Sequence, residues 1–492
     1  MSKIGVDVGG TFTDVMVVEE GDEGSSLRVF KTPSTPQNPE EGVVEGLKQV
    51  GEETGTSLDS VGYLSHGTTV ATNAVLERDW SETALVTTRG FRDVLEIARQ
   101  TREDLYDLQT EKTHPVVERD LRYEVSERVD EDGEVVEPVD EDEVREVAEE
   151  LKEKDIESVA VSFLFSFENP EHEERVAEIL RDEGVESNIS LSSEVLPEIR
   201  EYERTLVTSL NAVLKPVMSR YIRGLEEDNR GLGVPAELNV MQSSGGVFSA
   251  EDAREKPVNT LLSGPAAGVK GASYVAGLRD ENDIITLDMG GTSCDVSVVT
   301  DSEPVVSSEV EVGGYDVGVR SVDVHTVGAG GGSVAWVDEG GALRVGPRSA
   351  GARPGPVCYG RGGEEVTTTD AHYVLGRLEP DFLDDPEPRS EVIEVLRDEI
   401  AEPLGMEVEE AAEGVLDVAN ARMARALRVV SVERGYDPRD FSLVAFGGAG
   451  PLHASSLASE LDIPRVVVPR AAGVLSALGL LTSDVVHDLG VS

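Results

Sequence analysis

One residue pattern occurs twice in this chain, and it combines carboxylates, glycines and a threonine hydroxyl at fixed spacing. Residues 7–18 and 288–299 both read Asp-x-Gly-Gly-Thr-x-x-Asp-Val-x-Val-Val, and an apolar run precedes each. Glycine lets a backbone turn tightly and approach an anion closely, and successive N–H groups in such a turn form an anion-binding concavity. The repeat therefore predicts two turns that contact the phosphates of one nucleotide from opposite sides. Two unrelated hairpins with tight turns are the alternative interpretation.

The first acidic residue of each repeat is a candidate magnesium ligand. Asp7 and Asp288 follow the apolar runs directly. Mg²⁺ prefers a few carboxylates together with phosphate oxygens and water. The nearby hydroxyl and glycine N–H groups are expected to bind phosphate oxygens. These expected nucleotide contacts are Gly9, Gly10, Thr11, Thr13, Gly290, Gly291 and Thr292.

A third glycine turn follows the apolar run at residues 441–446. Gly447, Gly448 and Gly450 lie in a Gly-Gly-Ala-Gly sequence that leads into a helical pattern. Such a turn lets a purine and a ribose lie against bare backbone. Turns of this kind are common, so the motif is informative only because it follows two phosphate hairpins. We expect these three glycines to bind the adenosine part of a nucleotide.

Hydrophobic periodicity indicates which elements carry these motifs. Residues 4–8 and 12–18 read as two short strands joined by the Gly-Gly turn, and residues 158–167 as a further strand. Residues 126–143 are acidic and read as a solvated hairpin or linker. Helical spacing is found at residues 40–54, 141–154, 194–224 and 410–432.

Glycine is unusually dense between residues 328 and 363, in the stretches 328–332 and 346–363. This density predicts no regular structure. The neighbouring Trp336 and Tyr359 are not typical of linkers, so we interpret the region as an ordered loop that contributes to a site. A flexible loop is the alternative.

Composition limits the partners and the location of the protein. The formal net charge is -54, and a charge of this size repels nucleic acids and anionic membranes. Because the acidic residues are spread along the whole chain, we expect a cytoplasmic protein of a high-salt organism; an acidic surface for a basic partner is the alternative. No N-terminal signal peptide is evident, and no apolar run is long enough to span a membrane.

The order of the three glycine motifs resembles that of actin, Hsp70 chaperones and sugar kinases. This resemblance implies an α/β fold of two actin-like, ribonuclease H-like lobes with a nucleotide cleft between them. Further stretches are similar to the hydantoinase A and 5-oxoprolinase family, which includes the nucleotide-binding subunits of acetone and acetophenone carboxylases. They are HGTTVATN at 66–73, GFRD at 90–93, DLYDL at 104–108, EVLPEIREYER at 194–204, MQSSGG at 241–246, LSGPAAG at 262–268, HTVGAGGGS at 325–333, GPRSAGA at 346–352 and GPVCYG at 355–360.

The resemblance covers essentially the whole chain and implies two regions, residues 1–190 with the first phosphate hairpin and residues 191–492 with the second hairpin, the glycine-rich loop and the adenosine motif. Members of the family usually continue well past residue 488. The remaining C-terminal part is therefore expected to be missing from this sequence, encoded separately or lost.

The activity implied is ATP- and Mg²⁺-dependent hydrolysis of a cyclic amide such as hydantoin, N-methylhydantoin or 5-oxoproline. A hydantoinase B-type subunit is the expected partner, which implies a hetero-oligomer. The chain could instead be the nucleotide-binding subunit of an ATP-dependent ketone carboxylase. A small-metabolite kinase and an ATP-driven switch without a substrate are weaker alternatives.

The resemblance also suggests roles for individual residues. Asp14 and Asp295 are candidate catalytic residues that orient water or substrate, although either could simply stabilise its hairpin. His66, in the Gly-Thr-Thr turn, is a candidate partner of a substrate carbonyl or else a buried structural histidine. Asp323 and His325 could bind substrate or a metal. The expected substrate contacts are Thr68, Thr69, Asn73, Arg99, Arg102, Asp323 and His325.

Overall fold

The structure is a computed structural model, and two of the expected site residues fall outside the part that it describes. The expected contacts Thr11 and Arg102 therefore stay predictions. The described residues are 2–10, 12–21, 24–35, 38–54, 57–101, 106–107, 109, 112–185, 188–380 and 386–487.

The first phosphate motif lies in a six-stranded sheet with the order β12-β11-β4-β1-β2-β3. Strand β1 pairs antiparallel with β2 and parallel with β4, and β11 continues parallel beyond β4. The side chains of β1 are mostly buried, because helices cover the sheet around it. The strands are β1 (Ser2–Val8), β2 (Phe12–Gly21), β3 (Gly24–Pro33), β4 (Val61–Gly67), β11 (Leu238–Met241) and β12 (Val247–Ser249).

The second motif lies in a sheet that repeats this arrangement. Strand β13 pairs antiparallel with β14 and parallel with β23, which pairs parallel with β24. Strand β20 pairs with β14 as β3 pairs with β2, so the order β11-β4-β1-β2-β3 corresponds to β24-β23-β13-β14-β20. This repeat confirms the expected two-lobed α/β fold. The strands are β13 (Ile284–Met289), β14 (Cys294–Thr300), β15 (Glu303–Pro304), β20 (Val324–Val327), β23 (Ser442–Phe446) and β24 (Arg465–Val467).

Helices occupy corresponding places in the two lobes. A long helix precedes the strand parallel to the motif strand, and a second helix follows that strand directly after its turn. The first pair is α1 (Pro39–Thr54) and α13 (Val408–Val430), and the second pair is α2 (Val70–Glu77) and α14 (Gly450–Glu460).

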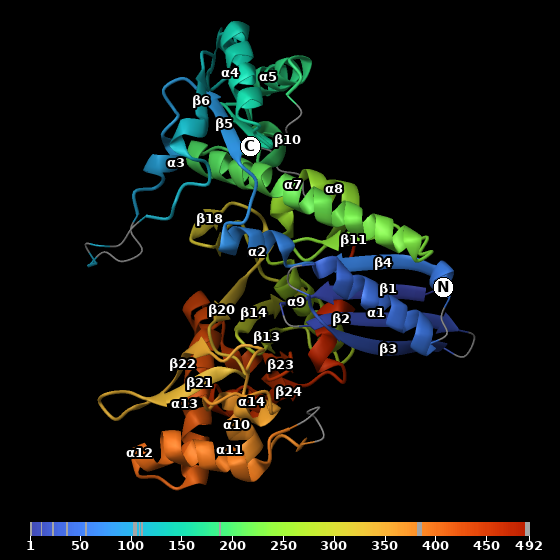
Figure 1. The fold of residues 1–492 in the computed structure, drawn as a ribbon, viewed down its shortest axis with the longest axis vertical. Helices are drawn as coiled ribbons and strands as arrows, with labels where there is room; N and C mark the ends of the chain where they lie inside the picture. The colour runs from blue at the N-terminus through green and yellow to red at the C-terminus, as the bar shows by residue number, and fades with distance from the viewer. Residues whose placement is uncertain are drawn as a thin grey trace.

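A separate four-stranded parallel sheet is inserted into the first lobe, and Figure 1 shows it at the opposite end of the molecule from α11 and α12. Helix α7 (Glu201–Gly231) connects this sheet to β11. Most side chains in the first four turns of α7 are buried. Because β11 and β12 follow α7, the first lobe takes strands from both sides of residue 190. The insertion contains β5 (Thr83–Thr88), β6 (Arg122–Val125), β9 (Ser158–Ser162), β10 (Asn188–Leu191), α4 (Glu141–Glu153) and α5 (Glu171–Asp182).

The second lobe also carries an insertion, between β20 and α13. Strands β21 (Ser333–Val337) and β22 (Leu343–Ser349) form an antiparallel hairpin there, so the expectation of no regular structure was wrong for this part of the glycine-rich region. Val334, Ala335 and Val345 of the hairpin are buried, whereas glycine spacing alone indicated only turns. The helices of the insertion are α10 (Thr368–Val374), α11 (Arg389–Leu396) and α12 (Glu402–Leu404).

A hairpin from the second half of the chain packs into the first lobe. Strands β17 (Val310–Val312) and β18 (Tyr315–Val317) form it, and Val312, Tyr315 and Val317 belong to the hydrophobic core of the first lobe. Gly313 at its tip has φ +61°, and a Cβ there would lie 3.2 Å from Val75 Cγ1 of α2. The second half of the chain therefore contributes residues to the core of the first lobe.

Glycines bring two helices and a strand into close contact near the junction of the lobes. Helix α15 (Leu475–Thr482) lies against α9 (Ser263–Gly277), where a Cβ on Gly271 would be 2.5 Å from Leu475 O. On its other side, α15 meets β1 at Gly5, where a Cβ would collide with Ala477 O. Only bare backbone fits these contacts, so larger residues would push α15 away from both neighbours.

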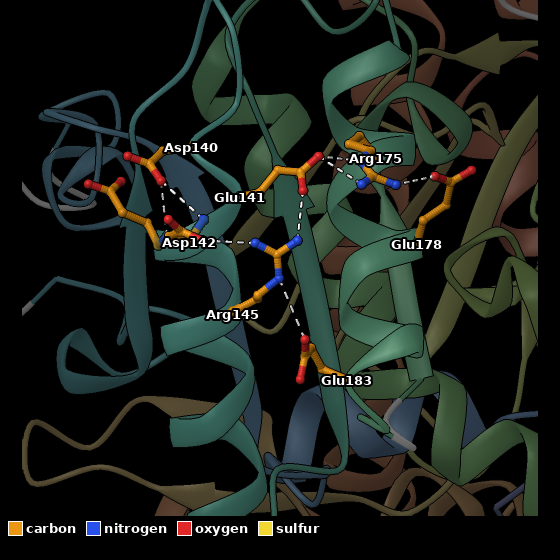
Figure 2. A network of polar contacts seen from close by, with 8 residues as sticks. Asp140, Glu141, Asp142, Arg145, Arg175, Glu178 and Glu183 are labelled. Atoms are coloured by element: carbon orange, nitrogen blue, oxygen red, sulfur yellow. Dashed lines mark hydrogen bonds and ion pairs between the residues drawn. The ribbon is translucent and has the colours of Figure 1, made fainter.

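The few basic residues of the insertion form networks with the many acidic ones. Figure 2 shows Arg145 and Arg175 both directed at Glu141, each with one nitrogen 2.7 Å from a carboxylate oxygen. Arg175 and then Arg145 hold the pKa of Glu141 below its ordinary value. Exposed pairs of this kind contribute little singly and are screened by salt. Among the described residues, no helix is both long enough and apolar enough to cross a membrane.

Candidate active site

The two glycine hairpins have the same local geometry. Asp7 lies opposite Asp14 across β1 and β2, and Asp288 lies opposite Asp295 across β13 and β14. Each turn is closed by one backbone hydrogen bond of 3.0 Å, from Gly9 N to Phe12 O and from Gly290 N to Ser293 O. The repeated sequence thus produces a repeated pair of facing carboxylates, each beside a glycine turn.

These carboxylates perturb one another. Desolvation by the surrounding protein, followed by repulsion from Asp14, raises the pKa of Asp7 to about 7. Desolvation also raises the pKa of Asp288 to about 8, with repulsion from Asp295, Asp7 and Asp14 as further causes. Asp7 and Asp14 of the first hairpin raise the pKa of Asp288 in the second. The two hairpins therefore lie close enough across the cleft for their charges to interact.

A glycine of the neighbouring parallel strand covers each of the two candidate magnesium ligands. A Cβ on Gly67, which ends β4, would lie 2.5 Å from Asp7 Oδ1, and one on Gly447, which follows β23, would collide with Asp288 Oδ1. Gly447 has φ +76°, a conformation that favours glycine. The His-Gly-Thr-Thr turn and the Gly-Gly-Ala-Gly turn therefore take equivalent places in the two lobes.

The glycine-rich loop rests directly on the second hairpin. Gly331 N donates to Gly290 O at 3.0 Å, and Gly332 N donates to Gly291 O at 2.7 Å. Thr369 N of α10 donates to Gly331 O at 2.9 Å, so α10 also holds the loop in place. A Cβ on Gly331 would be 3.6 Å from Ala449 Cβ, so this residue lies where the second hairpin and the turn at Gly447–Gly450 meet.

Lys31 is a site residue that the sequence analysis missed. It lies opposite Asp14 on β3, and its Nζ donates to Asp14 Oδ1 at 2.5 Å and to Gly473 O at 3.1 Å. The ammonium also lies 4.9 Å from the centre of the Phe12 ring in the turn. Lys31 directly follows the apolar run of Leu27, Val29 and Phe30, which could have indicated a third strand that places this cation at the hairpin.

In the second hairpin a neutral group takes the corresponding position. Thr326 of β20 lies opposite Asp295 and its Oγ1 donates to Asp295 Oδ1 at 2.6 Å. Desolvation raises the pKa of Asp295, and the hydrogen bond from Thr326 lowers it in part. Of the two candidate orienting carboxylates, Asp295 is therefore the one without a lysine on it.

The candidate residues after Asp295 have different surroundings. Asp323 forms an ion pair with Arg434, and His325 lies opposite Val296 on the other side of β14 from β13. The described residues contain no group of three or more His, Cys, Asp or Glu side chains placed to hold a metal ion. A role for either residue in substrate binding stays a prediction.

His66 is buried, and protein groups engage both of its ring nitrogens. Nδ1 lies 3.1 Å from Val6 O, so this nitrogen carries the proton, and Nε2 accepts from Tyr221 OH at 2.8 Å. Desolvation lowers the pKa of His66 to about 4, which keeps the ring neutral. This geometry favours a structural role for His66, whose side chain forms a hydrogen bond with the backbone of β1 at Val6. No sequence signal links it to Tyr221, which lies on α7.

The turn after His66 is held by hydrogen bonds to the following helix and to α9. Thr68 Oγ1 accepts from Val70 N at 3.2 Å, Thr68 O accepts from Ser263 Oγ at 2.9 Å, and Asn73 Nδ2 donates to Thr69 Oγ1 at 3.4 Å. Arg99, in contrast, pairs with Glu203 and lies in the insertion. The structure therefore brings Thr68 and Thr69 next to Asp7 through Gly67, whereas Arg99 belongs to another part of the molecule.

The residues of the cleft fit ATP and Mg²⁺. Among the described residues, nothing lies within 4 Å of the Cβ positions of Gly10, Gly290, Gly291 or Gly448, so their backbones border open space. Asp7 and Asp288 offer the one or two carboxylates that Mg²⁺ takes when phosphate oxygens and water complete its shell. Glycine N–H groups and hard oxygen ligands are the donor set that a magnesium-bound polyphosphate requires.

Known proteins resemble the chain over nearly its whole length. The caprolactamase subunit alpha of Pseudomonas jessenii is 39% identical over 99% of this chain and 71% of its own length. The acetophenone carboxylase gamma subunit of Aromatoleum aromaticum is 37% identical over 99% of this chain and 68% of its own length. The 5-oxoprolinase of Saccharomyces cerevisiae is 35% identical over 99% of this chain but only 41% of its own length.

Solved structures agree with these similarities. The ATP-dependent caprolactamase from Pseudomonas jessenii superposes with a TM-score of 0.88 at 38% identity, covering 98% of this chain and 71% of that one. A nucleotide-free acetone carboxylase superposes with a TM-score of 0.80 at 30% identity, covering 98% and 70%. Family models for the hydantoinase/oxoprolinase N-terminal region and for hydantoinase/oxoprolinase match residues 3–184 and 204–489. The chain belongs to the hydantoinase/oxoprolinase family.

Proposed function

We propose that this protein is the nucleotide-binding subunit of an enzyme that hydrolyses a cyclic amide at the expense of ATP. The observation that carries the proposal is the pair of facing hairpins, each with two carboxylates beside a glycine turn. Its relatives include an ATP-dependent caprolactamase and 5-oxoprolinases, which supports the choice of a cyclic amide.

Opening a lactam or imide is difficult because its carbonyl is a poor electrophile. Transfer of the γ-phosphoryl group of ATP to the carbonyl oxygen, with release of ADP, would activate the carbonyl carbon for attack by water. The ring C–N bond would then break with protonation of the nitrogen, and hydrolysis of the resulting acyl phosphate would release phosphate and the ring-opened acid. The work of the protein is then mainly positioning and electrostatic stabilisation. Asp7 and Asp288 would hold the magnesium ion, and the glycine turns would hold the phosphates.

Different roles follow for the two carboxylates on the second strands. Asp295, hydrogen-bonded by Thr326 alone, would orient the attacking water or the substrate. Asp14 is paired with Lys31, so its charge is already compensated. Lys31 would place a positive charge at the tip of the first hairpin, where charge accumulates on the transferred phosphoryl group.

A partner subunit and a cytoplasmic location also belong to this proposal. Two relatives are named as an alpha and a gamma subunit, so they come from enzymes with several different chains. A B-type partner would complete the site for ring hydrolysis in a hetero-oligomer. The high acidity is consistent with function in a salt-rich cytoplasm.

An ATP-dependent ketone carboxylase is the second candidate. The similarity to the acetophenone carboxylase gamma subunit and to the acetone carboxylase structure favours it. The same cleft would then activate a ketone as its enol phosphate, and bicarbonate would be required.

The discriminating experiment is an ATPase assay on the chain purified in molar salt together with the product of its neighbouring gene. Hydantoin, N-methylhydantoin, 5-oxoproline, caprolactam, and acetone with bicarbonate would be compared. ATP turnover stimulated by one cyclic amide, with release of the ring-opened acid, supports the proposal. Stimulation only by ketone with bicarbonate would replace it with the carboxylase, and a stable phosphorylated product would indicate a kinase.

A further inference from the structure

A cavity of about 840 Å³ lies between the insertion, the start of α7 and the β17–β18 hairpin. Its volume is in the range, roughly 300–1,000 Å³, of sites that enclose small organic molecules. None of its lining residues in the described part of the chain comes from the two phosphate hairpins. It is therefore a separate candidate binding site.

Hydrogen bonds tie the walls of this cavity together. Thr113 Oγ1 of the insertion donates to Gly314 O of the hairpin at 3.0 Å, and Tyr315 OH donates to His114 O at 2.7 Å. Tyr315 is itself buried in the core of the first lobe. Because both walls are anchored, the cavity is a built feature of the fold.

The charge of the cavity differs from that of the rest of the protein. The whole chain has 97 acidic and 43 basic residues, a ratio above two to one. Among the cavity-lining residues, arginine and lysine together are as numerous as aspartate and glutamate. The basic residues are Arg99, Lys112, Arg119 and Arg122, and the acidic residues are Glu96, Glu118, Glu311 and Asp316.

Arg122 differs from the other basic residues that line the cavity because its side chain is buried. Its side chain is 1% exposed, its Nε donates to Val117 O at 2.9 Å, and its Nη2 donates to Glu96 Oε2 at 3.3 Å. Its Nη1 is buried and has no hydrogen-bond partner among the described residues, since Asp93 Oδ1 is 3.9 Å away. A buried guanidinium with one nitrogen unused is costly, and an added oxygen acceptor would remove that cost.

We propose that this cavity binds a small zwitterionic amino acid, with its carboxylate on Arg122 and its ammonium towards Glu311 and Asp316. A multiply charged anion such as phosphate would be repelled by the lining carboxylates, and a simple cation would meet the arginines. One molecule that carries both charges complements a wall with both signs. The inference does not depend on the proposed reaction, although the ring-opened product of a lactam belongs to the same chemical class.

Intrinsic fluorescence provides a direct test on the whole chain without nucleotide. The chain has two tryptophans, and Trp80 packs on Tyr315 of the cavity wall with ring centroids 6.3 Å apart. In a Trp336→Phe background, Trp80 is the only tryptophan and reports on the cavity. In the salt that keeps the chain folded, 6-aminohexanoate and glutamate would be titrated against hexanoate, hexylamine and inorganic phosphate.

We expect a saturable fluorescence change with at least one amino acid and at least about tenfold weaker binding of hexanoate and hexylamine, since each half-ligand leaves one set of charges unpaired. Arg122→Gln should weaken binding of the amino acid by about tenfold or more. The matched control, Arg220→Gln, changes an exposed arginine outside this cavity and should bind as the parent does.

Three results would contradict amino acid binding in this cavity. Absence of a saturable change with every amino acid, equal binding by Arg122→Gln, or a preference for phosphate would each overturn it. If Arg122→Gln fails to fold, the double variant Glu311→Gln/Asp316→Asn changes only exposed side chains. It should weaken amino acid binding and leave hexanoate unaffected; equal affinity for the amino acid would also refute the proposal.

Discussion

The two glycine hairpins have the same backbone but different charge. Both close with a 3.0 Å hydrogen bond across the turn, and both place one aspartate opposite another. The first receives an ammonium from Lys31, whereas the second receives a hydroxyl from Thr326. The duplicated fold therefore fixes the positions of the groups, whereas the residue on the third strand, Lys31 or Thr326, decides the charge of each half of the cleft.

The supports of the two turns differ as well. Ser34 Oγ donates to Gly9 O at 2.7 Å behind the first turn. Behind the second, two backbone N–H groups of the glycine-rich loop donate to Gly290 and Gly291. Within the described residues, one side chain thus supports the first turn and a whole loop supports the second, so we expect the second turn to be the more rigid.

The largest effect should come from removing the candidate magnesium ligands. We expect Asp288→Asn to lower ATP turnover by about a thousandfold, because an amide lacks the negative charge that a carboxylate offers Mg²⁺. Phosphate release would measure it, with far-UV circular dichroism as a control for folding. Asp7→Asn is the matched variant: equal losses would show that both lobes contribute to one ion, and unchanged turnover in either would remove that residue from the metal site.

The charge difference between the hairpins predicts unequal losses on the third strands. Lys31→Met should lower kcat by about 10- to 100-fold, because it removes a charge-assisted contact, and Thr326→Val by less than about tenfold. Steady-state kinetics at saturating ATP would separate kcat from KM. Equal effects would mean that the two hairpins are electrostatically alike, contrary to the comparison.

The supports of the turns predict a smaller difference, in nucleotide affinity. A Cβ on Gly331 would be 2.8 Å from Thr369 Oγ1, so Gly331→Ala should displace the loop and weaken ATP binding about tenfold. Ser34→Ala removes one hydrogen bond and should cost about fivefold or less. Calorimetric titration with a non-hydrolysable ATP analogue would measure both, and a larger loss in Ser34→Ala would reverse the assignment of the rigid turn.

The smallest expected effect concerns stability of the metal-free chain. Burial raises the pKa of Asp288 to about 8 in the folded protein, whereas an aspartate in the unfolded chain has an ordinary pKa of 3.8. Folding therefore becomes less favourable as pH rises through this window, because the unfolded state binds fewer protons. An asparagine at this position has no proton to lose, so Asp288→Asn removes this dependence.

Melting curves in excess chelator should therefore show Asp288→Asn about 2 °C or more above the parent at pH 9, with the difference shrinking as the pH falls towards 4. Asp7→Asn should show the same trend with its midpoint nearer pH 7. A parent chain as stable as both variants at pH 9 would mean that these carboxylates ionise without cost.

Much of this arrangement could be predicted from the sequence, because the spacing within a hairpin is local. The Gly-Gly turn fixes the register that puts Asp7 opposite Asp14, and its repeat at residue 288 predicts the second lobe. The contact of His66 with Tyr221 joins residues 155 apart and has no local signal. The β21–β22 hairpin was missed because glycine content outweighed the alternating apolar residues beside it.

The hairpin that crosses into the first lobe has a consequence for dividing the chain. A cut near residue 190, between the two family-model matches, would leave the N-terminal fragment without β11, β12 and the core residues Val312, Tyr315 and Val317. That fragment would have one unpaired edge on β4 and a solvent-exposed cavity in its hydrophobic core. The two halves should consequently be insoluble when expressed apart and regain structure only when produced together, as in fragment complementation.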